Sequence, residues 1–179
     1  MIDFNKIVNK LCKKRWKVIF KDEIFEIIDP EKKWKYKLKL DKTIYRLRAE
    51  KIIISIKSWV YIVPWEEDFQ LNKIDLIEKY YLKLLKKYIT FHVWNSYYIS
   101  GQKSLEFHLK DFSVPEKIFI INRSLIKKIK VWNYEIIFKT ISGKIENKKI
   151  NLYSKMQEFT TKKDVDWLEF KTSCLELSL

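Results

Sequence analysis

The chain has 179 residues and a formal net charge of +14, with 47% hydrophobic and 16% aromatic residues. That composition can fill a hydrophobic core, so it excludes disorder as the main state, and the length suits one ordinary domain or two small ones. A pI of about 9.6 favours a polyanionic partner, nucleic acid before membrane. No run approaches the roughly 20 apolar residues of a membrane span and no export signal is visible, so we expect a cytoplasmic protein.

The first two predicted elements are short helices. Apolar residues at helical spacing predict a helix from Phe4 to Trp16, with lysines on its other face, and a second helix from Lys21 to Ile28. Asp29-Pro30 ends the second helix because proline lacks an N–H and restricts the residue before it.

A third helix is basic. Leu40, Ile44 and Leu47 recur at i, i+4 and i+7, which gives one apolar seam, while Lys42 and Arg46 lie on the opposite side. Asp41 precedes them as a candidate N-cap, so the sequence predicts a helix over Lys42 to Lys51.

A hairpin follows the third helix directly. Ile52, Ile54 and Ile56 alternate with more polar neighbours, which predicts a strand, and a second short run from Val60 to Pro64 predicts its partner. Lys57, Ser58 and Trp59 separate the two runs and would form the turn. A basic helix running into a tight hairpin is typical of the DNA-contacting half of a winged helix.

Charge is concentrated in this part of the chain. Residues 1–65 hold 17 Lys and Arg against 8 Asp and Glu, a net of +9, whereas residues 66–179 hold 20 against 15, a net of +5. Pro64 is followed by Trp65-Glu66-Glu67-Asp68, an abrupt change to acidic residues that predicts a linker. We therefore expect a first domain over 1–65 and a second over 66–179.

The second domain is predicted to be α+β. A continuous amphipathic pattern indicates a helix, and several apolar runs indicate strands. In chain order the predictions are a helix over Asn72–Tyr88, a strand over Tyr97–Ile99, a helix capped by Ser100 and ending at Leu109, a strand over Lys117–Ile121, strands over Ile129–Trp132 and Glu135–Ile141 joined by Asn133-Tyr134, and extended segments over Ile150–Tyr153 and Asp166–Thr172.

Some residue types are unusually rare or frequent. Two cysteines, Cys12 and Cys174, make neither a disulfide framework nor a metal site and are expected to be buried free thiols. Glycine occurs twice and tryptophan seven times, while Lys, Ile and Asn are heavily used, a bias that indicates a genomic cause. Most of the tryptophans are expected in the core, with stacking on single-stranded nucleic acid as the alternative.

Three segments together resemble a known family. They are V-Y-I-V-P from Val60 to Pro64, Y-Y-I-S-G-Q-K-S-L-E-F-H-L from Tyr97 to Leu109, and V-P-E-K-I-F-I-I-N from Val114 to Asn122. They resemble the AbiEi-type antitoxins, transcriptional regulators of the abortive-infection, type IV toxin-antitoxin class. The resemblance spans about residues 4 to 141, and Tyr97 to Leu109 is its most specific part.

The resemblance implies a fold and a function. The fold would be an N-terminal winged helix-turn-helix followed by an α+β antitoxin domain, and the function that of a DNA-binding autoregulator without enzymatic activity or cofactor. Its partners would be operator repeats in double-stranded DNA and, without a stable complex, a nucleotidyltransferase-like toxin. The family pattern continues beyond the part matching the last residues, so we expect the second domain to be shortened at its C-terminal end.

The same resemblance assigns the DNA-contacting residues to the third helix and the wing tip. They are Lys39, Lys42, Thr43, Tyr45, Arg46, Lys57 and Ser58. Relatives tend to have glycine before the first wing strand and Arg-Gly at the tip. This chain has Lys51 and Lys57-Ser58-Trp59 there instead.

Two alternatives are weighed against this hypothesis. Glu169-Phe170-Lys171, with Asp164 and Asp166 before it, is similar to half of a metal-dependent nuclease site, in which carboxylates bind Mg²⁺ and a lysine orients water. A winged helix can also serve as a protein-interaction module, whose basic face would meet an acidic partner. His92 and His108 have no carboxylate or cysteine at ligand spacing, so no metal site is predicted.

Overall fold

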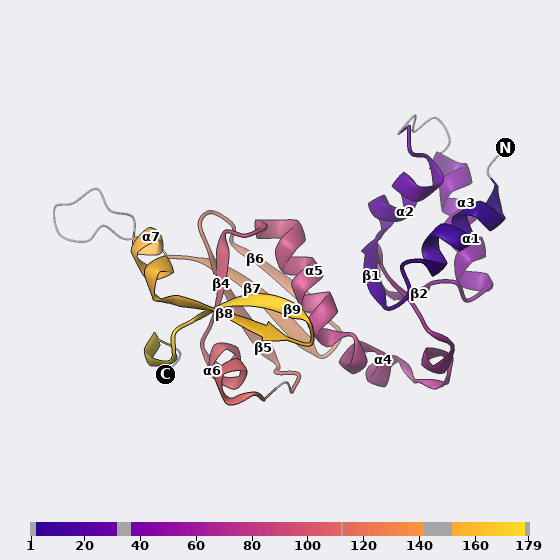
Figure 1. The fold of residues 1–179 in the computed structure, drawn as a ribbon. Helices are drawn as coiled ribbons and strands as arrows, with labels where there is room; N and C mark the ends of the chain where they lie inside the picture. The colour runs from indigo at the N-terminus through magenta and orange to yellow at the C-terminus, as the bar shows by residue number, and fades with distance from the viewer. Residues whose placement is uncertain (1–2, 32–36, 112, 142–151, 178–179) are drawn as a thin grey trace. The chain divides into compact units, whose positions relative to one another are not determined.

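The computed structural model describes residues 3–31, 37–111, 113–141 and 152–177 (Figure 1). The chain divides into two compact units, Met1–Tyr80 and Tyr81–Leu179, whereas the sequence analysis placed the domain boundary after residue 65. Both units mix helices with a sheet, so the predicted α+β class is confirmed.

The first unit contains helices and a small antiparallel sheet of strand order β1-β3-β2. In chain order its elements are α1 (Phe4–Cys12), β1 (Lys17–Phe20), α2 (Lys21–Ile28), α3 (Lys37–Ala49), β2 (Ile54–Lys57), β3 (Val60–Val63), the 3-10 helix η1 (Glu66–Gln70) and α4 (Lys73–Lys79).

One core joins the three first helices to the sheet. The predicted seam of Leu40, Ile44 and Leu47 is buried, as the helical spacing required. Its partners in the core come from α1, α2, β1, β3 and the segment before β2: Ile7, Leu11, Ile19, Ile24, Phe25, Ile53, Tyr61 and Val63.

The structure corrects two helix predictions in this unit. The predicted first helix is too long, because α1 ends at Cys12 and the chain then turns into β1, a strand that the sequence analysis missed. The predicted N-cap at Asp41 is wrong, because α3 begins at Lys37. Asp41 lies within the helix, where its Oδ1 is 2.6 Å from Lys21 Nζ and ties α3 to the start of α2. The second helix, Lys21–Ile28, is confirmed.

The predicted hairpin is present, but its alternation is not regular. Strands β2 and β3 pair antiparallel, with Ser58-Trp59 between them. The pairing register shifts between Ser55 and Lys57, so Ile53 and Ile56 are the buried residues instead of a strict period of two.

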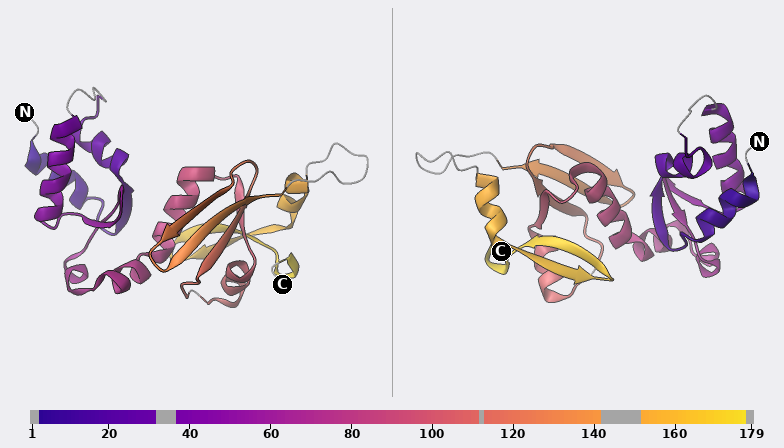
Figure 2. Two further views of the ribbon diagram at one scale, coloured as in Figure 1. Left: turned by 180° about the vertical axis from the view of Figure 1, so that it is seen from behind. Right: turned by 45° about the horizontal axis from the view of Figure 1, so that its top comes forward.

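The second unit is built on a six-stranded mixed sheet of order β6-β7-β5-β4-β9-β8. Helix α5 lies across one face of this sheet, as the front and back views agree (Figures 1 and 2). In chain order its elements are α5 (Tyr81–Val93), β4 (Tyr97–Ser100), α6 (Gln102–Leu109), β5 (Lys117–Asn122), β6 (Lys127–Val131), β7 (Tyr134–Thr140), α7 (Leu152–Met156), the 3-10 helix η2 (Gln157–Phe159), β8 (Thr160–Val165), β9 (Leu168–Ser173) and the 3-10 helix η3 (Leu175–Leu177).

Several boundaries beyond residue 70 differ from the predictions. The single helix predicted up to Tyr88 is broken at Tyr80 into α4 and α5. The N-cap of α6 is Gly101 instead of Ser100, and the turn between β6 and β7 is Trp132-Asn133 instead of Asn133-Tyr134.

The C-terminal part adds two corrections. Leu152 and Tyr153 begin the helix α7, so the prediction of an extended segment there is wrong, while Ile150 and Asn151 lie outside the described residues. Asp166 and Trp167 form a turn, and the strand predicted to include them is β9, which begins at Leu168.

The tryptophans and cysteines lie in other environments than predicted. All six tryptophans that the structure describes are exposed, so the core prediction is wrong for them; Trp34 lies outside the described residues. Cys12 and Cys174 are free but only half-buried, and the prediction of burial is wrong there too.

Candidate nucleic-acid interface

Helix α3 presents an exposed cationic face. Its seam residues Leu40, Ile44 and Leu47 point into the core, so Lys42 and Tyr45 lie on the outward side. Tyr45 is 72% exposed, which is unusual for a large aromatic side chain. Lys42 makes no ion pair within the described part of the chain. The outward face therefore offers a cation and an aromatic ring that no other side chain of this face neutralises or covers.

Arg46 lies on the same face but is engaged within the unit. Its Nε donates to Glu50 Oε1 at 2.7 Å, and its guanidinium lies 3.8 Å from the centre of the Phe4 ring. A guanidinium stacked on an aromatic ring in this way holds α1 against α3. Contact of Arg46 with a ligand would therefore compete with a structural role, which the sequence analysis did not foresee.

The other predicted residues of α3 are placed less favourably. Thr43 is half-buried on the flank of the helix. Lys39 belongs to the first turn of α3, and its side chain lies outside the described residues.

The tip of the β2–β3 hairpin carries the remaining predicted residues. Lys57 and Ser58 are both exposed, and Ser55 Oγ donates to the backbone oxygen of Lys57 at 3.4 Å. Trp59 completes the turn with φ 76° and is 62% exposed.

Two basic residues that were not among the predicted contacts, Arg48 in the last turn of α3 and Lys51 just after it, border a hollow beside the hairpin. This shallow hollow is lined by Tyr45, Arg48 and Lys51, with Ala49, Ile53 and Ile54 as its apolar walls. Arg48 and Lys51 are exposed. Both residues lie in the basic run that predicted a DNA contact, so the charge pattern could have indicated them. The position of Lys51 beside Tyr45, in contrast, depends on the turn after α3.

The turn after α3 is a Schellman motif, a helix end at which glycine is the usual residue. Ile52 N–H donates to Leu47 O at 2.8 Å and Lys51 N–H to Arg48 O at 3.0 Å, the pair of bonds of a Schellman motif. Lys51 occupies its left-handed position with φ 57°. Lys51 thus stands at a position where this backbone requires a positive φ, which glycine adopts without steric cost.

We expect Lys51→Gly to stabilise the protein by about 0.5 to 1 kcal/mol, because glycine adopts a positive φ without steric cost. The midpoint of urea unfolding should rise accordingly. Ala49→Gly is the matched control, because it places glycine in the last right-handed turn of α3 and should cost up to about 1 kcal/mol. A lower midpoint for Lys51→Gly would contradict this account of the turn.

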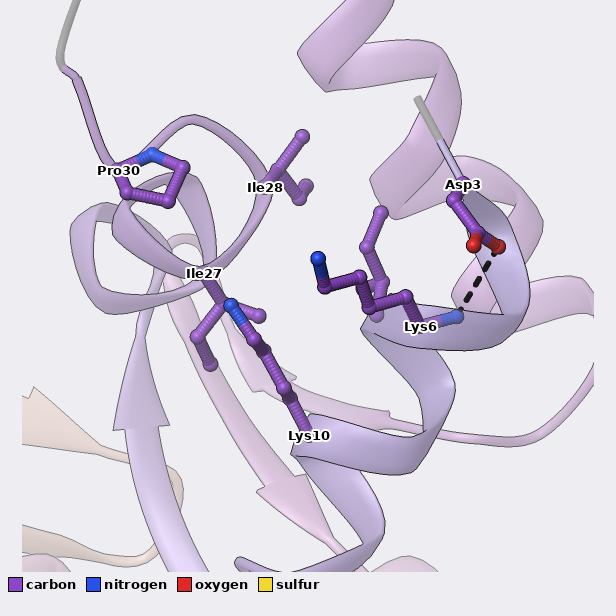
Figure 3. Close-up of a pocket in the computed structure, with 7 residues that line it drawn as sticks. Asp3, Lys6, Lys10, Ile27, Ile28 and Pro30 are labelled. Carbon is purple, nitrogen blue, oxygen red and sulfur yellow. Dashed lines mark hydrogen bonds between the residues drawn. The ribbon is translucent and has the colours of Figure 1, made fainter. Parts of the chain in front are cut away.

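Helix α1 carries a second cationic face. Lys6, Lys10 and Lys13 follow one another at helical spacing, are exposed, and make no ion pair within the described ranges. Figure 3 shows Lys6 and Lys10 beside a pocket whose apolar walls include Ile27, Ile28 and Pro30. Asp3 lies at the rim, where its Oδ1 accepts from the Lys6 N–H at 3.2 Å as the N-cap of α1.

One charged pair of the second unit is buried. Lys103 is 1% exposed; its Nζ lies 2.9 Å from Glu106 Oε2 and 2.6 Å from Ser113 O. Burial lowers the pKa of Lys103, while its ion pair with Glu106 acts in the opposite direction. This pair fixes the loop after α6 and offers no exposed reactive group.

The serine and histidine side chains near α6 do not form a nucleophilic arrangement. Ser104 Oγ donates to Ser173 O, Ser173 Oγ donates to Ser104 Oγ, and His108 Nε2 is 2.8 Å from Ser173 O. The histidine thus contacts a backbone carbonyl, and no serine hydroxyl among the described residues is hydrogen-bonded to it, as a serine nucleophile would require.

The residues of the nuclease alternative have other partners. Glu169 Oε2 is 3.0 Å from Lys162 Nζ, and Lys171 Nζ bonds to Gln157. Asp166 lies in the turn between β8 and β9, and Asp164 faces Glu169 across that hairpin. No group of three or more His, Cys, Asp or Glu side chains that could hold a metal ion occurs among the described residues.

Two further observations bound the functional assignment. Within the described part of the chain, none of the helices has both the length and the apolar character needed to cross a bilayer. Comparison with models of known protein families gives no match, and comparison with curated proteins gives none either.

Proposed function

We propose that the chain is a DNA-binding transcriptional regulator whose first unit is a winged helix-turn-helix domain. In this proposal α3 enters the major groove and the β2–β3 hairpin is the wing. The order α1-β1-α2-α3-β2-β3 and the sheet order β1-β3-β2 support it. The observation that carries the proposal is the outward face of α3, which is followed by a hairpin with Lys57 at its tip. On that face Lys42, which makes no ion pair with any residue that the structure describes, lies beside exposed Tyr45.

Phosphate contacts would supply most of the affinity. Lys57, Arg48 and Lys51 are exposed around α3 and the hairpin, where they can neutralise phosphates and release counterions. Base contacts would come from the outward face of α3, where Lys42 can donate to guanine acceptors and Tyr45 can contact base edges or sugar. Arg46 would contribute less than its charge suggests, because Glu50 and Phe4 already hold its guanidinium.

We further propose that the regulator is an antitoxin that represses its own promoter. The support is the resemblance over Tyr97–Leu109, a segment that forms β4, the N-cap Gly101 and α6. Its functional partner would be a nucleotidyltransferase-like toxin, with which it forms no stable complex. Co-expression with the neighbouring gene tests this part: rescue of growth from a toxic neighbour supports it, and a neighbour that is harmless alone contradicts it.

Substitutions on α3 and on the wing should weaken DNA binding in different ways. Against DNA from upstream of its own gene, Lys42→Ala should cost about 1 to 3 kcal/mol and reduce the preference over a scrambled duplex, because base contacts carry the specificity. Lys57→Ala should weaken both duplexes equally and lower the log–log salt slope by about 0.9, the value of one phosphate contact.

The measurement is a titration of both duplexes at two or more salt concentrations. Lys73→Ala is the matched control, because it removes one exposed lysine charge from a different helix, α4. If Lys42→Ala and Lys57→Ala both bind like Lys73→Ala, the basic surface of α3 and the hairpin is not a DNA interface, and an acidic protein partner becomes the better proposal.

A further inference from the structure

Five tryptophans share a backbone conformation that tryptophan rarely adopts. Their φ angles lie between 51° and 76°, in the left-handed region where a β-carbon clashes with the backbone. They are Trp16, Trp59, Trp94, Trp132 and Trp167, and they account for five of the eight non-glycine residues with positive φ in the described chain. A bulky side chain is an outlier in this region, so five cases in one chain require a common cause.

Two of the five tryptophans lie in hairpin turns, at positions where the turn type favours glycine. Between β8 and β9, Asp166 and Trp167 both have positive φ, the pattern of a type I′ turn, for which Asp-Gly is a preferred pair. Between β6 and β7, Trp132 has positive φ and is the first of two central residues, which is the glycine position of a type II′ turn.

The other three lie at ends of helices and strands with the same requirement. Trp94 directly follows α5 in the left-handed position that glycine usually fills after a helix. Trp59 ends the two-residue connection of a hairpin that contains a bulge, and Trp16 ends the turn between α1 and β1. Each of the three is a single residue in a connection between two elements, where a positive φ favours glycine.

The five tryptophan side chains differ in how much surface they bury, and none belongs to the hydrophobic core. Trp167 is 99% exposed and buries almost no apolar surface, Trp94 is 69% and Trp59 62% exposed, and Trp16 and Trp132 are about half exposed. Lysine ammonium groups lie 5.9 Å from the Trp16 ring and 5.6 Å from the Trp59 ring, at the outer limit of a cation–π contact. Strain kept for function collects at one site, whereas these five residues are spread over five separate connections in both units.

Composition points in the same direction. Average glycine usage of about 7% corresponds to roughly 13 residues in a chain of this length. This chain has 2 glycines and 7 tryptophans. The one glycine that the structure describes, Gly101, also has a positive φ of 67°. Tryptophan therefore occupies positive-φ positions that glycine usually fills.

We infer that these five positions are glycine in the protein made by its native host, because the gene carries UGA codons there and the host reads UGA as glycine. UGA is assigned to tryptophan in some genetic codes and to glycine in others, and one reassignment converts all five positions together. The heavy use of Lys and Ile, which have A- and U-rich codons, fits a gene in which UGA is frequent. The inference does not depend on the proposed DNA-binding function.

The experiment combines the coding sequence with stability. We expect UGA at all five codons, and peptide mass spectrometry of the protein from its host should find glycine at each. With the recombinant chain, Trp132→Gly and Trp167→Gly should each raise the urea midpoint, and the five-fold variant should raise it further. Trp65→Gly is the control: Trp65 has φ −86° and lies under the Arg15 guanidinium, so glycine there should lower the midpoint.

Two results would overturn the inference. UGG codons at these positions would show that tryptophan is encoded under every assignment. Lower urea midpoints for Trp132→Gly and Trp167→Gly would show that the turns do not favour glycine. The codon sequence and the urea midpoints of the two single variants each test the inference, so neither test requires the five-fold variant to fold.

Discussion

Leu47→Ala is expected to destabilise the first unit by about 2 to 5 kcal/mol, because a fully buried leucine loses its transfer free energy and leaves a cavity. Leu47 is 0% exposed and packs in the core formed by α1, α2, α3 and the sheet. A domain of this size has a net stability of about 5 to 15 kcal/mol, so this loss is a large fraction of the total. Urea unfolding, followed by hydrogen exchange of the α3 amides, measures it in the first unit specifically.

Lys42→Ala is the matched control for Leu47→Ala, because it truncates an exposed side chain of the same helix. It should change the unfolding free energy by no more than about 0.5 kcal/mol while it weakens DNA binding. Equal destabilisation by the two substitutions would contradict the assignment of Leu47 to the core face of α3 and of Lys42 to its outward face. The two variants therefore separate loss of binding by unfolding from loss of binding by a missing contact.

The loss of unfolding free energy for Arg46→Ala should lie between those for Leu47→Ala and Lys42→Ala. The sequence alone suggests a folding-neutral substitution, since Arg46 is on the polar side of the seam. Its ring contact with Phe4 and its ion pair with Glu50 change that expectation to a loss of about 1 kcal/mol. The Glu50 partner could have been expected from the i, i+4 spacing, whereas Phe4 comes from another helix and no local pattern indicates it.

The helical seams were predictable because they depend on spacing within one segment. Leu40, Ile44 and Leu47 are buried as the period of 3.6 requires, and Lys21–Ile28 is the observed α2. Strand β1 was not predictable in the same way. It has four residues, and what makes it a strand is its pairing with β3, more than 40 positions later in the chain.

The break between α4 and α5 has a similar cause. The apolar pattern runs through Tyr80 without interruption, so a single helix was the natural prediction. Tyr80 instead directs its hydroxyl to Asp68 at 2.6 Å, a contact across twelve positions that no periodicity reports. For the candidate interface, the sequence placed Lys42, Tyr45 and Lys57 on exposed surfaces but could not place Lys51 beside Tyr45, since that depends on the turn after α3.

Asp68 is the second position at which a large effect is expected. Its carboxylate is 1% exposed and accepts three hydrogen bonds, from Tyr80 Oη at 2.6 Å, Lys79 Nζ at 2.7 Å and the Trp65 N–H at 2.8 Å. Asp68→Ala removes all three and takes the buried acceptor away from the Tyr80 hydroxyl and the Trp65 N–H, whereas Lys79 is 30% exposed and can turn to water or Glu67. We expect a loss of about 3 kcal/mol in the unfolding free energy, because hydrogen bonds to a buried charge are strong and their donors are left without an acceptor.

Glu67→Gln is the control for Asp68, because Glu67 is the neighbouring acid, is 85% exposed and lies 3.8 Å from the same lysine. An exposed pair of this kind contributes little, so its loss should be below about 1 kcal/mol. A comparable loss for the two variants would mean that Asp68 acts only through general charge attraction to Lys79 and that its buried hydrogen bonds contribute nothing.

The contribution of Asp68 should also depend on pH, with a definite sign. Burial raises the pKa of Asp68, and the bonds from Lys79, Tyr80 and the Trp65 N–H outweigh it, so the pKa in the folded protein lies below the ordinary value. A depressed folded pKa stabilises the protein fully above the unfolded pKa of about 4, and that stabilisation is lost as the pH falls through the folded pKa. The stability difference between the parent chain and Asp68→Asn should therefore be constant from about pH 5 to 8 and shrink below about pH 4. If the difference instead grows as the pH falls below 4, the folded pKa of Asp68 is raised, and burial outweighs the three hydrogen bonds.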